Sequence, residues 1–146
     1  MSEKSYDPRM HTAEHILNQT MVRMFGCKRA FSSHIEKKKS KCDYRIPNPI
    51  DMNKLVEVER IVNEIIRLNL EVTDEFVSKE DAAKFLDLNR LPADASSTIR
   101  VVRIGDYDAC ACIGPHVKHT NEIGTFRIIS SDYAEGILRI RFRLES

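Results

Sequence analysis

Several features that would assign this chain to a specialised class are missing. It has no tryptophan, no apolar stretch long enough to cross a membrane, and a polar start at residues 1–8 without the apolar core of a signal peptide. Internal repeats and low-complexity linkers are also absent. We therefore expect a cytoplasmic protein that does not enter the membrane. A length of 146 residues fits one domain with its own core, so we expect a single domain over 1–146.

The chain also has few cysteines and a small net charge. Four cysteines in a reducing compartment do not indicate a disulfide framework, and they favour metal binding or burial instead. Cys27 and Cys42 are isolated, whereas Cys110 and Cys112 form a close pair. A net charge of +1 is lower than that of proteins that coat RNA. It is compatible with a protein that grips only the end of an RNA through a local patch.

Hydrophobic periodicity predicts a mixed architecture. Helices are expected at 8–25, capped by Asp7 and closed by Gly26, at 52–67, capped by Asp51, and at 78–86. Strands are expected within 30–46, as a pair around a polar turn, and at 70–77, 99–104, 107–112, 125–129 and 137–144, with a loop at 91–97. In the last strand, Leu138, Ile140, Phe142 and Leu144 alternate with Arg139, Arg141 and Arg143, which face outward. Short hairpin turns between strands predict the α+β class, with a mainly antiparallel sheet packed with a few helices.

Two motifs carry the chemistry. In His11-Thr-Ala-Glu-His15 the two histidines lie one helical turn apart, to one side of the apolar stripe, so both imidazoles can reach one ion. A lone motif of this kind is often just two surface histidines. In Cys112-Ile-Gly-Pro-His116 a strand end runs into a tight turn, where a thiolate and an imidazole can converge. Two nitrogens on a helix with a sulfur and a nitrogen on a loop form a ligand set that suits Zn²⁺.

Neighbouring residues leave alternatives open. Cys110 shares a strand face with Cys112 and can replace or assist it, although Cys112 stands next to His116 in the turn. Glu14 points about a quarter turn away from the helical histidines, so we do not assign it as general base. His34 and His119 are interpreted as surface or pocket-lining residues. The basic run Lys37, Lys38, Lys39 and Lys41 is either a solvated turn or a contact to RNA phosphates.

The segments "HTAEHIL" and "CIGPHVKHTNEIG", about a hundred residues apart, resemble the editing domain shared by alanyl- and threonyl-tRNA synthetases. Within this family the chain is similar to the short freestanding alanyl-tRNA editing proteins of the AlaX type. The stretches "IVNEII", "IRVVRIGDYDAC" and "RIRF" extend the resemblance over nearly the whole chain. The resemblance implies an α+β domain with its site in a cleft between the first helix and the sheet.

The same resemblance implies an aminoacyl-tRNA deacylase that acts in trans and binds the tRNA acceptor end. It would hydrolyse the ester of Ser- or Gly-tRNA(Ala) at a zinc site formed by His11, His15, Cys112 and His116. Four protein ligands would close a zinc site, so one of them, such as His116, would leave or act as a base. The three histidines are thus the expected catalytic residues. Ser32, Ser33 and His34 are candidates for a pocket wall that rejects alanine.

One departure keeps other functions open. The alanyl branch carries Cys-Gly-Gly-Thr-His at the second motif, whereas Gly114-Pro115-His116 resembles the threonyl branch. That branch implies removal of serine from tRNA(Thr), and a metal-free reaction in which a histidine orients the water. Two further alternatives are a non-catalytic, zinc-bearing module that binds tRNA or a synthetase, and a hydrolase of another small ester or amide.

Overall fold

A computed structural model describes residues 7–84 and 98–145. Two antiparallel sheets and three α-helices make up this part of the chain, which confirms the α+β class. The helices are α1 (Pro8–Phe25), α2 (Met52–Arg67) and α3 (Lys79–Ala82), with a short 3₁₀ helix η2 (Thr120–Ile123). The strands are β1 (Ser32–His34), β2 (Ser40–Arg45), β3 (Val72–Ser78), β4 (Thr98–Ile104), β5 (Asp108–Ala111), β6 (Thr125–Ala134) and β7 (Ile137–Glu145).

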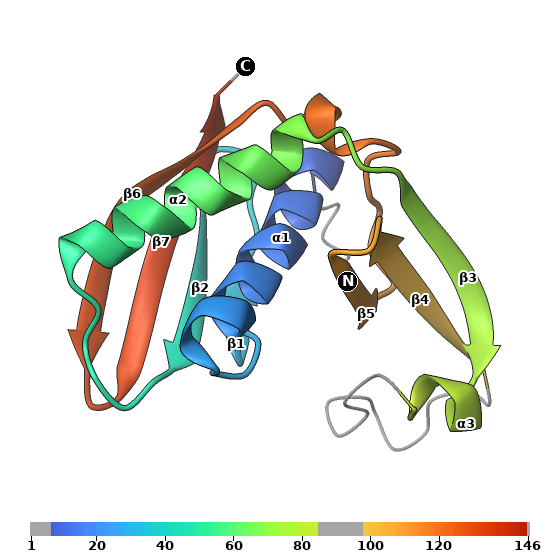
Figure 1. Cartoon of the computed structure of the whole chain (residues 1–146), viewed down its shortest axis with the longest axis horizontal. Helices are drawn as coiled ribbons and strands as arrows, with labels where there is room; N and C mark the ends of the chain where they lie inside the picture. Colours follow the sequence, from blue (N-terminus) through green and yellow to red (C-terminus); the bar gives the residue numbers. More distant parts are fainter. Residues whose placement is uncertain (1–6, 85–97, 146) are drawn as a thin grey trace.

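The larger sheet has the order β1-β2-β7-β6, and α1 and α2 lie against it (Figure 1). Alternation in β7 occurs as expected, because Leu138, Ile140 and Phe142 are buried in the main core. The helix α1 begins with Asp7, whose side chain accepts the N–H groups of Arg9 and Met10. Its apolar stripe packs into the core, which leaves an adjacent strip of the helix facing the second sheet.

The smaller sheet, in the order β3-β4-β5, stands apart from the larger one (Figure 1). The sequence predicts these strands but not their division into two sheets, because alternation shows which residues share a face and not which strands pair. A small separate core forms under this sheet around Ala82, Ile99 and Val101. Its last strand, β5, contacts α1 and leads into the Cys112–His116 turn.

Two elements differ in length from the expectation. The strand β6 continues to Ala134 instead of ending at Ile129, because its polar residues pair with β7 across a turn at Glu135 and Gly136. Both turn residues have positive φ, at 53° and 79°, the conformation of a two-residue hairpin turn. The helix α3 ends at Ala82, and residues 85–97, which include the predicted loop, lie outside the described part. No helix in the described ranges is long and apolar enough to span a bilayer.

Candidate metal centre and active site

Four side chains from the two motifs meet between α1 and the loop after β5. One donor atom each from His11, His15, Cys112 and His116 lies within 4.8 Å of the other three. The rings of His11 and His116 stack at 4.4 Å between centroids, and His15 meets both edge-on. The two histidines on α1 are buried, while Cys112 and His116 are partly exposed. The structure thus brings together all four residues that the sequence selected as metal ligands.

The hydrogen bonds of the histidines fix which ring nitrogen faces this cluster. Nδ1 of His11 lies 3.1 Å from the carbonyl oxygen of Pro115, which can only accept, so that nitrogen carries the proton. Nδ1 of His15 lies 3.4 Å from Oδ2 of Asp108, a contact that likewise favours a proton on Nδ1. In both rings Nε2 is left with a lone pair for a ligand.

Thr12 orients the third ring in the same way. Its hydroxyl donates to the carbonyl of Pro8 at 2.9 Å. The hydroxyl proton of Thr12 is therefore already engaged. In the 2.9 Å contact between Thr12 Oγ1 and His116 Nδ1, the histidine N–H must be the donor and the hydroxyl oxygen the acceptor. The N–H of Val117 also donates to this hydroxyl, at 3.2 Å. A neutral His116 then presents Nε2 to the cluster, and its burial lowers the pKa further in favour of that neutral form.

The sulfur of Cys112 completes the set. Sγ lies 3.3 Å from Nε2 of His11 and 3.4 Å from Nε2 of His116, and the N–H of Gly114 points at it from 3.4 Å. Burial disfavours a thiolate, but hydrogen bonds from the three histidines outweigh it and lower the pKa of Cys112 to about 3. These bonds need a proton on the Nε2 side of the rings in the metal-free protein, and a metal ion that binds there displaces it. The thiolate is the form that binds metals.

Two of these separations match those around a tetrahedral ion. With a metal–sulfur distance of about 2.3 Å and metal–nitrogen distances of about 2.05 Å, a tetrahedral site places sulfur and nitrogen about 3.5 Å apart. The two sulfur–nitrogen distances observed, 3.3 and 3.4 Å, are close to that value. Nδ1 of His11 and of His116 each has a hydrogen-bond partner, as metal-bound histidines do, and Nδ1 of His15 lies 3.4 Å from the Asp108 carboxylate without a hydrogen bond. The residues present therefore fit a metal ion of the Zn²⁺ type.

A buried network behind His15 was not identified from the sequence. The Asp108 carboxylate is fully buried and receives two hydrogen bonds from Arg29, at 2.7 and 3.2 Å, and one from Gln19 at 2.9 Å. Burial alone would raise the pKa of Asp108, yet His15 and Arg29 hold it well below the usual range. The period of two along β5 places Asp108 on the same face as Cys110 and Cys112, and this signal was present in the sequence.

The loop that carries the second motif is fixed by Arg100 of β4. Its Nη1 donates to the carbonyls of Cys112 and Gly114, at 3.1 and 2.8 Å, while its Nε binds Asp74. The guanidinium therefore holds the backbone on both sides of Ile113. This role was not predicted, since no sequence pattern links a strand arginine to a particular loop.

Glu14 lies closer to the cluster than the helical wheel indicated. Its Oε1 is 3.8 Å from Nε2 of His11, and its Oε2 accepts a hydrogen bond of 2.7 Å from the hydroxyl of Ser33. The expected quarter turn separates Cα positions, whereas a long side chain at i+3 can reach back to the earlier residue. Ser33 is the one member of the predicted substrate wall that touches a residue beside the cluster; Ser32 and His34 are exposed on β1.

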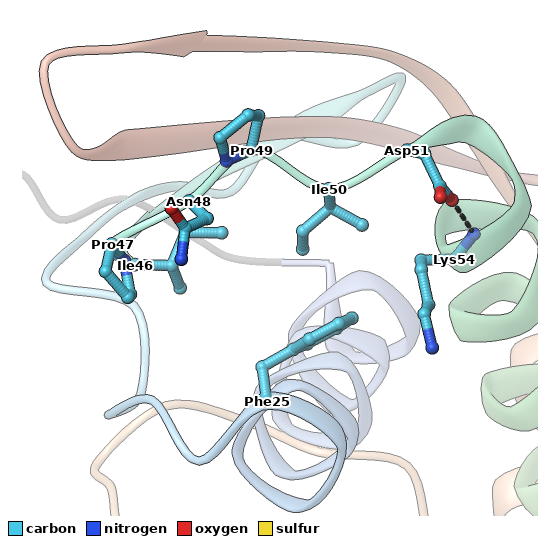
Figure 2. Close-up of a pocket in the computed structure, with 8 residues that line it drawn as sticks. All are labelled: Phe25, Ile46, Pro47, Asn48, Pro49, Ile50, Asp51 and Lys54. Atoms are coloured by element: carbon cyan, nitrogen blue, oxygen red, sulfur yellow. Dashed lines mark hydrogen bonds between the residues drawn. The ribbon is translucent and has the colours of Figure 1, made fainter.

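The basic run lies further along the same hairpin. Lys37, Lys38 and Lys39 are exposed in the turn between β1 and β2, and Lys41 pairs in register with His34. Lys39, Lys41, His34 and Arg141 of β7 line one shallow pocket. A second pocket lies elsewhere, between Phe25 at the end of α1, the 46–50 segment and the first turn of α2 (Figure 2). It contains none of the four clustered donors.

Other expectations hold at the surface. His119 is exposed and begins η2, so it lies outside the cluster of four. Arg139, Arg141 and Arg143 face outward and pair with Asp43, Asp132 and Glu145. Such paired arginines are typical of a solvated sheet face.

Comparisons with known proteins agree with this geometry. Residues 99–141 match the family model described as the threonyl and alanyl tRNA synthetase second additional domain. The chain is 35% identical over 137 residues to an alanine–tRNA ligase of Treponema pallidum, with 92% of the chain aligned. It is 36% identical over 135 residues to the enzyme of Coxiella burnetii, with 90% aligned. The chain spans 23% and 16% of the lengths of these two relatives.

The alignments with these two relatives span about nine-tenths of the chain. The first motif lies outside the matched family model, but it is joined to the second by direct side-chain contacts. The chain therefore belongs to the family of the second additional domain of threonyl and alanyl tRNA synthetases.

Proposed function

We propose that this chain is a zinc-dependent deacylase that hydrolyses the ester between a wrong amino acid and the 3′ end of a tRNA. The observation that carries the proposal is the convergence of three Nε2 lone pairs and one thiolate in a relative of the alanine–tRNA ligases. His11, His15, Cys112 and His116 would hold the ion. Bound there, Zn²⁺ would supply a Lewis acid that polarises the ester carbonyl or lowers the pKa of a water molecule.

The four donors differ in how firmly the protein holds them. His15 is buried against Asp108, whereas His116 is partly exposed and kept neutral at Nε2. We assign His116 as the residue that gives up its ligand role and accepts a proton at Nε2, because its Nδ1–H stays bonded to Thr12. His11 and His15 stay in place on α1.

The substrate would approach along β1. Ser33 of β1 contacts Glu14 of α1, Ser32 and His34 flank it in the strand, and the hairpin continues to Lys37, Lys38, Lys39 and Lys41. We assign the serines and His34 to the acyl group and the lysines to the phosphates of the acceptor end. The order along the hairpin follows the order of these groups in an aminoacyl-tRNA.

We propose Ser- or Gly-tRNA(Ala) as the substrate, hydrolysed in trans. Pro115 departs from the alanyl pattern, but the site uses only its carbonyl, which any residue provides. The departure therefore leaves the ligand geometry intact. The threonyl-type substrate, Ser-tRNA(Thr), is the second candidate, because Gly114-Pro115-His116 follows that branch.

Parallel deacylation assays with Ser-tRNA(Ala) and Ser-tRNA(Thr) test the proposal. We expect fast release of serine from the first, loss of at least about a hundredfold in His11→Ala, and one zinc per chain in the wild type only. His119→Ala is the matched control, since this exposed histidine lies outside the cluster. Release from Ser-tRNA(Thr) alone would select the threonyl branch. No release from either, with zinc still bound, would identify a non-catalytic module.

A further inference from the structure

Glu14 is a carboxylate that no arginine or lysine among residues 7–84 and 98–145 pairs with. Its side chain is only 13% exposed, and Ser33 supplies its one hydrogen bond among the described residues. Its single ion-pair contact within 4 Å is to Nε2 of His11. When His11 serves as a ligand, that nitrogen donates its lone pair and carries no charge of its own. The charge of the ion would be partly offset by the Cys112 thiolate, so Glu14 would still have no cationic side chain to pair with.

The Arg29 guanidinium, which interacts electrostatically with Glu14, is paired with another residue. Arg29 directs both of its terminal nitrogens at Asp108, and it feels the charge of Glu14 only at longer range. A carboxylate largely removed from water and without a directly paired cationic side chain costs free energy, because only part of the lost hydration is compensated. Such an arrangement at the edge of a reaction centre indicates that a positive group arrives with the substrate.

An aminoacyl ester carries that group. Its α-ammonium is attached to the carbon next to the reacting carbonyl, about 2.5 Å from the carbonyl carbon by standard bond lengths. Oε1 of Glu14 lies 3.8 Å from a donor atom of the cluster, so a carbonyl at the cluster brings the ammonium within reach of this carboxylate. The second oxygen is already held by Ser33, which fixes the direction of the first.

We propose that Glu14 binds the α-ammonium group of the substrate and makes the site selective for esters with a free amino group. This inference rests on the proposed function. It predicts that peptidyl-tRNA and other N-acylated esters are excluded, because an amide nitrogen has no charge to pair with the Glu14 carboxylate. A translating ribosome's peptidyl-tRNA would then be safe from this hydrolase.

The test compares two esters of equal size. Seryl-tRNA is treated with nitrous acid, which converts the α-amino group to hydroxyl and removes the charge with little change in volume. We measure kcat/KM for both esters with wild type, Glu14→Gln and the control Glu64→Gln on the outer face of α2. We expect Glu14→Gln to lose at least about tenfold on seryl-tRNA, equal to about 1.4 kcal/mol, and to change less than about twofold on the hydroxy ester.

Each other outcome overturns the inference in a distinct way. Equal losses on both esters would make Glu14 a base or a structural residue, and a drop in zinc content would make it a ligand. The glutamine oxygen of Glu14→Gln still accepts the hydrogen bond from Ser33, so we expect the fold to be retained, and the unfolding midpoint checks this. Ser33→Ala is a second variant, for which we expect a smaller loss of kcat/KM on seryl-tRNA than for Glu14→Gln. No turnover by the wild type would overturn the proposed function and this inference together, whereas turnover with unchanged selectivity in Glu14→Gln overturns this inference alone.

Discussion

At the scale of single residues, the site depends on partners that set each histidine ring. Pro115 and Thr12 each form a hydrogen bond with one Nδ1, and Asp108 lies 3.4 Å from the third, so the three Nε2 atoms face inward before any ligand binds. Of the three partners, Asp108 is the only charged one, and its removal would leave Arg29 partly buried without its carboxylate. Orientation by outer partners has a measurable effect on metal affinity.

Asp108→Asn should therefore weaken zinc binding by about 10–100-fold and lower the free energy of unfolding of the metal-free protein by about 3 kcal/mol. Chelator competition and denaturant titration measure the two effects. Asp106→Asn, in the exposed turn before β5, is the control. An unchanged zinc affinity in Asp108→Asn would show that His15 keeps its orientation without the carboxylate.

The two cysteines of β5 and its following loop give a second prediction. Sγ of Cys112 contacts two of the histidines directly, and Cys110 is not among the four clustered donors. Cys112→Ser should lose most of its zinc after dialysis, while Cys110→Ser should keep about one zinc per chain. Metal analysis of both preparations decides between them, and the reverse result would assign Cys110 as the ligand.

At the scale of elements, local patterns predicted α1, the final alternating strand and both motifs, because caps and periodicity act within a few residues. They could not predict the network around Asp108, whose partner Arg29 is 79 positions away. The contact of Glu14 with His11 was not predicted, because a helical wheel shows Cα directions and ignores the reach of a long side chain. The split into two sheets was missed because pairing is a property of the fold and not of one strand.

The hydrogen bonds from Arg100 to the carbonyls of Cys112 and Gly114 connect two elements, because they link β4 to the loop after β5. Arg100→Ala should reduce kcat on the misacylated tRNA by about tenfold, since two loop carbonyls lose their donor and the cluster loses its fixed geometry. Arg103→Ala is the control, as it lies on the opposite face of the same strand. Equal kinetics for the two variants would show that the loop holds its shape unaided.

At the scale of the whole molecule, the net charge is only +1, so a tRNA would have to be bound by a local cluster of basic residues. Replacing Lys37, Lys38 and Lys39 together with alanine should weaken tRNA binding about equally for all sequences and lower the salt slope by about 2–3. Binding titrations at several salt concentrations measure this. The paired change of Lys79 and Lys84, at α3, is the control. An unaltered slope in the triple variant would remove the turn from the RNA contact.

The donors of the candidate centre come from positions 101 residues apart, His11 on α1 and Cys112 after β5. An ion bonded to both would act on the unfolded chain as a cross-link that closes a loop of about a hundred residues. In the chain-entropy account, a loop of that size is worth about 4–5 kcal/mol. The ion would then stabilise the attachment of the smaller sheet to α1, in addition to its role in the reaction. In the metal-free protein, the small sheet with its three-residue core should be the first part to exchange its amide hydrogens.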